Sequence, residues 1–382
     1  MRKKHFLFAS VLALLCGSST LHAQDFKLTS SGYFKNQGVD VMAFDDIYPE
    51  GHQGGVCIIM NGHRVATNGD IRLEATPGQW QPVPKQLDRK LGDNSITATL
   101  CYPDSSRHLT GFNPMIYPDL HLIYTVNVES KGKNIEVTVD LDRPIPQEFI
   151  GKVGFNLEFF PGSLFGKPWI MDGQSGIFPQ QPNSPLMTTQ PNYLHTGNYH
   201  DGKQSLADMD KLIGKGYSPI VADDIISEPY AKGRKFTSRP DDPYNKVTIE
   251  SLSGDLQLFD GRMNHNNGWF VLRSNIKPGV TKGAVKWIIT PNVVADWMYQ
   301  PVIQTSQIGY HPAQDKEAVI EMDIRDNRKE TAQIIRIDAD GEKVVKNVTP
   351  ANWGKFLRYN RYDGCIPESV ALVKADSGQM EE

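Results

Sequence analysis

The feature that most constrains this chain is a succession of short segments in which apolar and polar residues alternate. This period of two is that of a strand with one buried face. The pattern is clearest in HLIYTVNV (121–128) and NIEVTVDL (134–141), which a short polar loop containing Gly132 joins, so we expect a hairpin there. Further strand-like runs are VCIIM (56–60), SITATLC (95–101), VGFNLEF (153–159), NKVTIESL (245–252), DLQLFD (255–260), GWFVLRSN (268–275) and GAVKWIIT (283–290). The chain is therefore predicted to be all-β.

The middle of the chain has a different composition. Residues 161–245 are rich in Pro, Gly, Asn and Gln, and only LADMDKLI (206–213) has a helical spacing. The aromatic residues of this stretch argue against a disordered linker, so we expect elaborated loops that cross a sandwich face. Ser253-Gly254 is predicted to join its two flanking runs as a tight turn. Residues 24–300 are thus expected to form one large two-sheet β-sandwich with long loop insertions.

The N-terminus has the layout of a secretory signal peptide. Residues 1–23 begin with Arg2, Lys3 and Lys4, continue with an apolar run over 6–15, and end on Ala23. That run falls well short of the roughly 20 residues that span a bilayer. The sequence predicts an exported protein, periplasmic or extracellular.

Charge and motif content narrow the function classes. The formal charge of −4 becomes −7 once the three basic residues of the signal peptide are removed. A mildly acidic surface offers no electrostatic footprint for nucleic acid. No further apolar run is long enough to cross a membrane, so no membrane span is expected. The histidines show no metal-ligand spacing, and no Walker or dinucleotide motif is present, so we expect neither a metal nor a cofactor.

Cys57 and Cys101 lie in apolar, strand-like contexts. In an exported protein they could form a disulfide, and two buried free thiols are the alternative.

A second β module is predicted to begin near residue 301. KEAVIEMD, AQIIRID and EKVVKNV are three short strands about a dozen residues apart, and Asp340-Gly341 makes the turn between the last two. They resemble the beginning of an Ig-like sandwich, which needs about seven strands and roughly 100 residues. Residues 301–382 are therefore expected to be a partial Ig-like β-sandwich.

The start of this module resembles the N-terminal Ig-like domain of family 9 glycoside hydrolases, the cellulase and endoglucanase family. That domain opens with an Asn-Gln-Val-Gly-Tyr-like segment followed by a proline and a Lys-x-Ala-Val strand. The matching residues are Ser306, Gln307, Ile308, Gly309, Tyr310, Pro312, Lys316, Ala318 and Val319. The resemblance covers about 304–360, and the preceding sandwich looks like the long N-terminal extension of such enzymes in gut Bacteroidetes.

The resemblance implies a setting of polysaccharide degradation, with a β-glucan or related plant polysaccharide as the partner. In this family an (α/α)₆ barrel follows the Ig-like domain and cleaves with inversion, using a carboxylic acid and a carboxylate base. No long amphipathic helices appear in this chain, and Asp338-Ala339-Asp340-Gly341 has the wrong order for the family's base motif. After about residue 360 the strand pattern gives way to a polar, acidic finish, in which SVALV (369–373) is a candidate final strand. The resemblance therefore implies the non-catalytic N-terminal module of a truncated enzyme, without catalytic residues. The alternative is a stand-alone carbohydrate-binding sandwich protein.

The densest group of carboxylates is Asp45, Asp46 and Glu50, with His52 nearby. An acid/base pair or a cation site is one interpretation. A solvated loop shaped by Asp and Gly is the other, and we favour it because adjacent residues of an extended chain point in opposite directions.

Two segments are candidates for binding a sugar. Trp80 lies between prolines in a polar context, where a central strand is disfavoured. In FDGRMNHNNGWF (259–270), polar side chains could bond sugar hydroxyls while Trp269 stacks on a pyranose face. The structural alternative, a hairpin loop with Trp269 in the core, is the one we favour. The carbohydrate-binding candidates are Trp80, Asn264, His265, Asn267 and Trp269.

Overall fold

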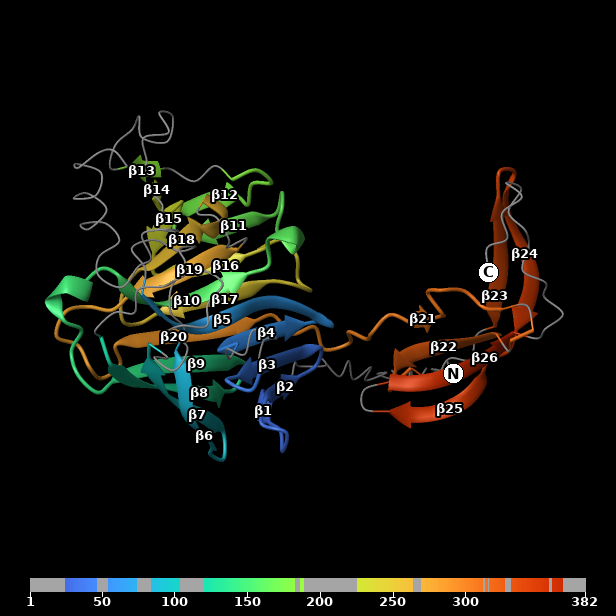
Figure 1. Ribbon diagram of the computed structural model, residues 1–382, viewed down its shortest axis with the longest axis horizontal. Helices are drawn as coiled ribbons and strands as arrows, with labels where there is room; N and C mark the ends of the chain where they lie inside the picture. Colours follow the sequence, from blue (N-terminus) through green and yellow to red (C-terminus); the bar gives the residue numbers. More distant parts are fainter. Residues whose placement is uncertain are drawn as a thin grey trace, which may run out of the picture.

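A computed structural model describes most of the chain (Figure 1). The described residues are 25–46, 54–73, 84–103, 120–182, 186–188, 225–263, 269–311, 313–314, 316–326, 331–356 and 359–366. The predicted signal peptide, the helical segment at 206–213 and the candidate strand at 369–373 lie outside these residues.

The larger body of the molecule is built on two antiparallel nine-stranded sheets. The first sheet has the strand order β1-β2-β3-β4-β5-β10-β19-β18-β15. Its strands are β1 (Lys27–Leu28), β2 (Phe34–Asn36), β3 (Val39–Ala43), β4 (Val56–Met60), β5 (His63–Leu73), β10 (Val153–Phe159), β15 (Ala231–Gly233), β18 (Leu256–Asp260) and β19 (Phe270–Asn275).

The second sheet has the order β12-β11-β16-β17-β20-β9-β8-β7-β6. Its strands are β6 (Lys85–Leu91), β7 (Ser95–Tyr102), β8 (Leu122–Lys131), β9 (Asn134–Leu141), β11 (Pro168–Met171), β12 (Gln174–Ile177), β16 (Lys235–Ser238), β17 (Val247–Ser251) and β20 (Val285–Pro291). Short 3₁₀ helices, η2 (Gln147–Phe149), η3 (Pro161–Ser163) and η4 (Gly261–Met263), lie between strands.

The two sheets pack face to face over one apolar core. Alternate residues of β7, β9 and β20 are buried, as their period-two sequences predict. Phe155 of the first sheet meets Trp287 of the second edge to face, with ring centroids 5.0 Å apart. The indole nitrogen of Trp287 donates to the Ser274 hydroxyl at 3.0 Å, so its one polar atom is satisfied inside the core. The predicted all-β, two-sheet sandwich is confirmed.

The predicted hairpin of 121–141 is also confirmed, because β8 and β9 pair from Tyr124 with Leu141 to Lys131 with Asn134. The predicted tight turn at Ser253-Gly254 is wrong as a hairpin, because β17 belongs to the second sheet and β18 to the first. The chain crosses the sandwich here. Ser253 Oγ accepts from the Lys286 amide at 2.9 Å, and Ser251 Oγ accepts from the Gly254 amide at 3.3 Å.

The middle region is more regular than its composition suggests. Its described parts add β11, β12 and β16 to one end of the second sheet and β15 to the end of the first. A separate two-stranded sheet pairs β13 (Leu186–Thr188) with β14 (Ile225–Ser227). The prediction of loops alone is therefore wrong for these segments, and the remainder of 161–245 lies outside the described residues.

A smaller β module follows the sandwich and projects from it (Figure 1). A four-stranded sheet has the order β21-β22-β26-β25, and β23 pairs with β24 in a two-stranded sheet. The strands are β21 (Val302–Gln304), β22 (Lys316–Asp323), β23 (Ala332–Asp338), β24 (Gly341–Val348), β25 (Ala351–Phe356) and β26 (Tyr359–Ile366). The predicted turn at Asp340-Gly341 is confirmed, whereas β26 continues the strand pattern past residue 360, where the sequence suggested that it ended.

The Gly-Tyr motif of this module shapes the loop between β21 and β22. Gly309 has a φ of +79°, a conformation that favours glycine. The Tyr310 hydroxyl accepts from the Ser306 amide at 3.1 Å and donates to the Glu317 carbonyl. The tyrosine thus fastens the loop to the start of β22, which explains why these residue types occur together.

Candidate functional site

The acidic segment at 45–46 is held by two arginines that lie on different strands. Arg64 of β5 pairs with the Asp46 carboxylate, whereas the Asp45 carboxylate is 3.8 Å from Arg89 of β6. Arg89 also donates to the Ala43 carbonyl at 2.8 Å. The two carboxylates therefore have different partners, as the extended-chain argument predicts. These ion pairs hold the segment that follows β3. Glu50 and His52 lie outside the described residues.

The predicted sugar-binding loop at 259–270 is anchored by a buried ion pair. The Asp260 side chain is fully buried and receives both Nε and Nη2 of Arg262 at 2.8 Å, together with the Tyr230 hydroxyl at 3.0 Å. Arg262 also donates to the carbonyls of Pro179 and Gln180, each at 2.8 Å. This planar fork joins η4 to a distant segment, so Asp260 and Arg262 are structural residues.

Aromatic rings surround this anchor. The Arg262 guanidinium lies 4.5 Å from the ring centroid of Phe270 and 5.1 Å from that of Phe165. Trp269 is half-buried, and its ring packs edge to face on Phe160 at 4.3 Å between centroids. The structure thus places Trp269 in an aromatic packing contact at the edge of the sandwich and does not bury it in the core. Asn264, His265 and Asn267 lie outside the described residues, as does Trp80.

Cys57 and Cys101 are free thiols. Cys57 is buried, and its Sγ lies 3.2 Å from the Gly54 carbonyl and 3.1 Å from the Thr67 hydroxyl. Burial raises the pKa of the Cys57 thiol, an effect that the Thr67 contact opposes. The thiol is therefore protonated and unreactive at neutral pH. The structure has no disulfide between them, and it buries Cys57 but leaves Cys101 half-buried.

A seam joins the sandwich to the C-terminal module. Trp297 and Tyr299, whose rings are 4.3 Å apart edge to face, cover the two hairpin turns that follow β2 and β4. Gly38 in the first turn has a φ of +66°, and a Cβ there would lie 2.7 Å from the Trp297 ring. Gly62 in the second has a φ of +84°, and a Cβ there would lie 3.2 Å from the Tyr299 ring. Glycine is therefore needed in both turns for the aromatic pair to sit this close.

Polar contacts complete the seam. Gln37 Nε2 donates to the Trp297 carbonyl at 2.8 Å, and Arg325 donates to the same oxygen. Asp323, at the end of β22, receives Nε and Nη2 of Arg325, each at 2.9 Å, and the Tyr299 amide at 3.0 Å. Burial acts to raise the pKa of Asp323, but these donors outweigh it and hold that pKa below its usual value.

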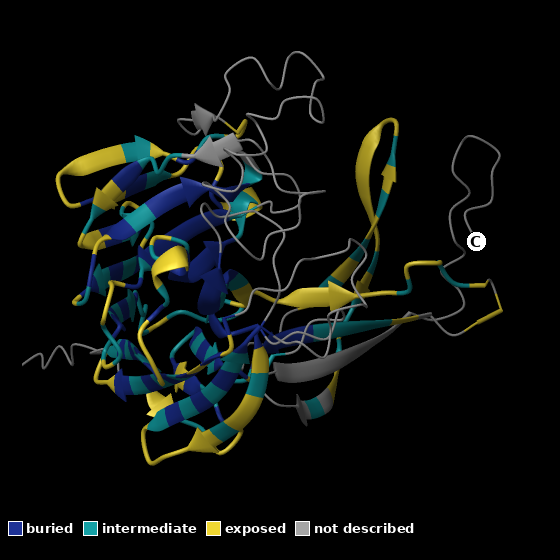
Figure 2. Cartoon of the chain, turned by 60° about the vertical axis from the view of Figure 1, so that its left-hand side comes forward, coloured by how far each residue is buried: buried dark blue, intermediate teal, exposed yellow. Residues whose placement is uncertain are grey.

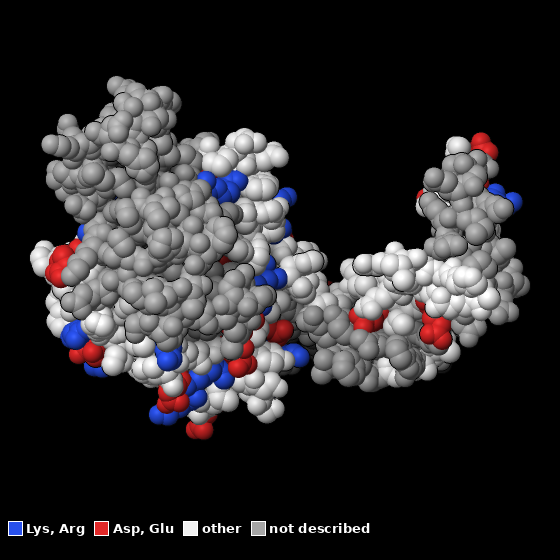
Figure 3. All heavy atoms as spheres, in the orientation of Figure 1, with Lys and Arg blue, Asp and Glu red and all other residues white. Residues whose placement is uncertain are grey.

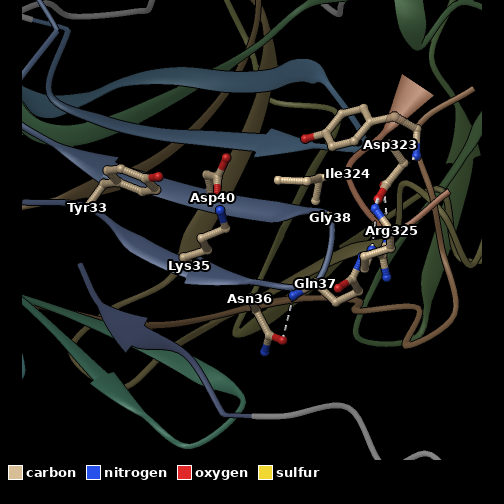
Figure 4. Close-up of a pocket in the computed structure, with 10 residues that line it drawn as sticks. Tyr33, Lys35, Asn36, Gln37, Gly38, Asp40, Asp323, Ile324 and Arg325 are labelled. Carbon is tan, nitrogen blue, oxygen red and sulfur yellow. Dashed lines mark hydrogen bonds and ion pairs between the residues drawn. The ribbon is translucent and has the colours of Figure 1, made fainter. Parts of the chain in front are cut away.

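A cleft of about 660 Å³ opens at this seam. Its lining combines the β2–β3 hairpin with the end of β22: Tyr33, Lys35, Asn36, Gln37, Gly38, Asp40, Tyr299, Asp323, Ile324 and Arg325. Lys35 and Asp40 are directly opposite in the register of β2 and β3. In Figure 4, Tyr33 and Lys35 both direct their polar ends toward Asp40, and Ile324 faces this row from the other module. The cleft is the candidate functional site.

The sequence analysis did not predict this site, because its residues come from both modules. Gln37 and Trp297, which are hydrogen-bonded across the seam, are 260 positions apart in the sequence. Tyr33, Lys35 and Asp40 look like ordinary residues of an outer strand face. A usable signal was present in DWMYQP (296–301), where two aromatic residues precede a proline at the predicted domain boundary. Tryptophan is highly buried on average in folded proteins, so a Trp beside a Tyr at this boundary points to a packed contact there.

The described residues carry no other evident site chemistry. They contain no group of three His, Cys, Asp or Glu side chains that could hold a metal ion. No helix among them is long and apolar enough to cross a membrane. On the face in Figure 3, the described basic and acidic side chains of the sandwich are interspersed rather than gathered by sign.

Comparisons with known proteins identify no family. No family model and no curated protein matches the chain. The Slr1438 protein from Synechocystis sp. PCC 6803 has a TM-score of 0.30 and 8% sequence identity, covering 76% of this chain and 98% of that chain. A galactose mutarotase-like protein from Lactobacillus casei ATCC 334 has a TM-score of 0.32 and 11% identity, covering 68% and 98%. Likeness at this level assigns no activity.

Proposed function

We propose that this chain is the non-catalytic N-terminal part of a secreted polysaccharide-degrading enzyme of the family 9 glycoside hydrolase type. In this role the sandwich and the C-terminal module support and orient a catalytic (α/α)₆ barrel that follows them. The resemblance of residues 304–319 motivates the family, and the polysaccharide is a β-glucan or a related plant glycan.

The observation that supports this role best is the apolar surface of the C-terminal module. Ile335 and Val344 are direct partners across β23 and β24, and Ile337 lies two residues along the same face. These side chains are 42%, 45% and 76% exposed. Figure 2 shows the exposed stretches of this hairpin, which stands clear of the sandwich. A solvent-facing apolar row of this kind is typical of a surface that another domain covers.

The candidate carboxylates support a non-catalytic role. Asp46 and Asp260 are each engaged by an arginine of their own neighbourhood, and Asp45 lies beside a third. An inverting glycosidase needs an acid and a base about 6.5–9.5 Å apart around a substrate cleft. Carboxylates that hold turns and loops through arginines do not provide that pair.

The proposal is tested by reducing-sugar release. We expect the purified chain to release no reducing sugar from β-glucan or xyloglucan above the level of a heat-denatured sample. Release that is abolished by Asp45→Asn or Asp46→Asn, with the fold retained, would contradict the proposal. The nucleotide sequence downstream of codon 382 gives a second check, since we expect a frame that encodes a helical barrel with two carboxylate motifs.

A further inference from the structure

We propose that the seam cleft binds a short, uncharged oligosaccharide segment. The site lies between the β2–β3 hairpin and the end of β22, and its ligand touches both modules. The choice of a sugar among neutral polar ligands rests on the proposed function, whereas the site itself rests on the geometry that follows.

The charges of the cleft favour a neutral ligand. Its lining carries two cationic side chains, Lys35 and Arg325, and two anionic ones, Asp40 and Asp323. Arg325 and Asp323 neutralise each other through a two-bond fork, and Lys35 stands opposite Asp40. A phosphate or a polyuronate would meet as much repulsion as attraction here, so anionic ligands are disfavoured.

The remaining groups suit a polyhydroxylated ligand. In the described part of the chain, the Lys35 ammonium, the Tyr33 hydroxyl and the Gln37 amide oxygen make no protein hydrogen bond, although all three line the cleft. The ammonium is a donor, the hydroxyl can donate or accept, and the amide oxygen is an acceptor. The hydroxyl groups of a sugar can bond to all three. The Tyr33 ring, which also lines the cleft, offers an apolar face for the C–H side of a pyranose.

The size of the cleft agrees with this ligand. Its volume of about 660 Å³ lies within the range of about 300–1,000 Å³ that is typical of ligand sites. The cleft lies at the junction of the two modules, and this volume has room for a short segment of a few sugar rings.

Calorimetric titration of the full chain tests the assignment. The probes are cellotriose and xylotriose, with trigalacturonate as the anionic counterpart. We expect at least one neutral trisaccharide to bind and trigalacturonate to bind more weakly. Tyr33→Ala and Lys35→Ala should each weaken binding about tenfold, through loss of a ring face and of a charge-assisted hydrogen bond respectively.

Matched controls lie elsewhere on the surface. Tyr244→Ala and Lys232→Ala remove exposed side chains of the same kinds outside the cleft and should leave binding unchanged. Tyr33→Phe keeps the ring, so it separates stacking from hydroxyl contacts if Tyr33→Ala proves unstable in urea. The assignment is overturned if neither neutral trisaccharide binds, if trigalacturonate binds more tightly, or if the controls weaken binding as much as the cleft variants. The two proposals fail separately, because cleavage of β-glucan by the chain would remove the support role, whereas a flat titration removes the cleft assignment.

Discussion

Single residues decide how closely the two modules approach. Gly38 combines a left-handed backbone with an approach to the Trp297 ring that leaves no room for a methyl group. Gly279 has a similar φ of +73°, but a Cβ there would have nothing within 4 Å. The pair therefore separates backbone strain from crowding at Gly38, where a Cβ would lie 2.7 Å from both the Trp297 ring and the Asn61 Oδ1.

We expect Gly279→Ala to cost about 1–2 kcal/mol of unfolding free energy, the usual penalty for a left-handed alanine. Gly38→Ala should cost about 1–3 kcal/mol more, because the added methyl group clashes with the Trp297 ring and with the Asn61 Oδ1. Urea unfolding measures both variants. Equal losses would show that the contacts with Trp297 and Asn61 do not constrain Gly38.

Arg262 is the second residue on which a distant contact depends. Arg262→Lys keeps the charge but loses the planar fork to Asp260 and the bonds to the carbonyls of Pro179 and Gln180. We expect a loss of about 2–3 kcal/mol in urea unfolding. Arg234→Lys, at an exposed position, is the control and should change stability little. A loss equal to the control's would show that the fork contributes no stability.

At this scale, sequence reasoning succeeds where the cause is local. The geometry of an extended chain predicts that Asp45 and Asp46 point apart, and the structure gives the two carboxylates different arginines. The role of Arg262 does not follow, because two of its acceptors lie more than eighty positions away in sequence. From the sequence alone, a loop rich in Asn, Asp and Arg resembles a binding loop. The bonds of Arg262 to the Pro179 and Gln180 carbonyls, which show its structural role, are visible only in the structure.

Among the elements, the end of β22 holds the seam through one carboxylate. The folded-state pKa of Asp323 lies below its usual value, chiefly because the donors of Arg325 and the Tyr299 amide outweigh the effect of burial. A depressed carboxyl pKa contributes stability that is fully present above the unfolded pKa of about 4 and is lost as the pH falls through the folded value. The seam should therefore be insensitive to pH near neutrality and loosen only in acid.

Small-angle scattering between pH 7 and pH 3 checks this expectation. The radius of gyration should rise at the acid end, and Asp323→Asn should show the rise already at pH 7, with little further dependence on pH. Asp140→Asn is the control, since Asp140 also has a lowered pKa but pairs with Lys282 on the sandwich. An acid expansion that Asp323→Asn leaves unchanged would contradict the assignment.

Elements with neighbouring partners were predictable, and those with distant partners were not. The β8–β9 hairpin follows from two alternating runs and a short loop. The step from β17 to β18 has the same local appearance, yet β17 pairs with β16 and β20 while β18 pairs with β15 and β19. Loop length and turn residues do not determine whether two consecutive strands pair or lie in different sheets. That outcome depends on the other strands with which each of them pairs.

At the scale of the whole molecule, the two modules differ in how much they bury. The sandwich encloses one continuous apolar core. Met322 is buried, and it is the one such apolar residue among those beyond 300 whose side-chain burial is described, whereas β21 and most of β24 are exposed. The stability of the C-terminal module should therefore be low compared with that of the sandwich.

Limited proteolysis with subtilisin tests this difference. We expect the first cuts to lie beyond residue 310 and to leave a resistant fragment that contains β1 to β20. Mass spectrometry of the early products identifies the sites. Cuts in β5 or β9 that appear as early as those in β23 or β24 would contradict the expectation.

The partition into a large sandwich and a small module was predictable from the spacing of strands. The placement of the modules was not, because it depends on Trp297 and Tyr299 meeting two turns near the opposite end of the chain. No periodicity in the sequence reports such a contact.

Trp297 and Tyr299 pack on two hairpin turns, and this contact restricts where insertions can occur in the chain. Surface turns are normally the places where insertions accumulate during evolution, since they carry little of the fold. The turns at Gly38 and Gly62 are exceptions, because one added residue in either would push the aromatic pair away. Among homologues, their lengths should vary less than those of turns such as the one at Gly151, where a Cβ would meet nothing within 4 Å. A linker designed to replace 292–301 would likewise need to match these two turns.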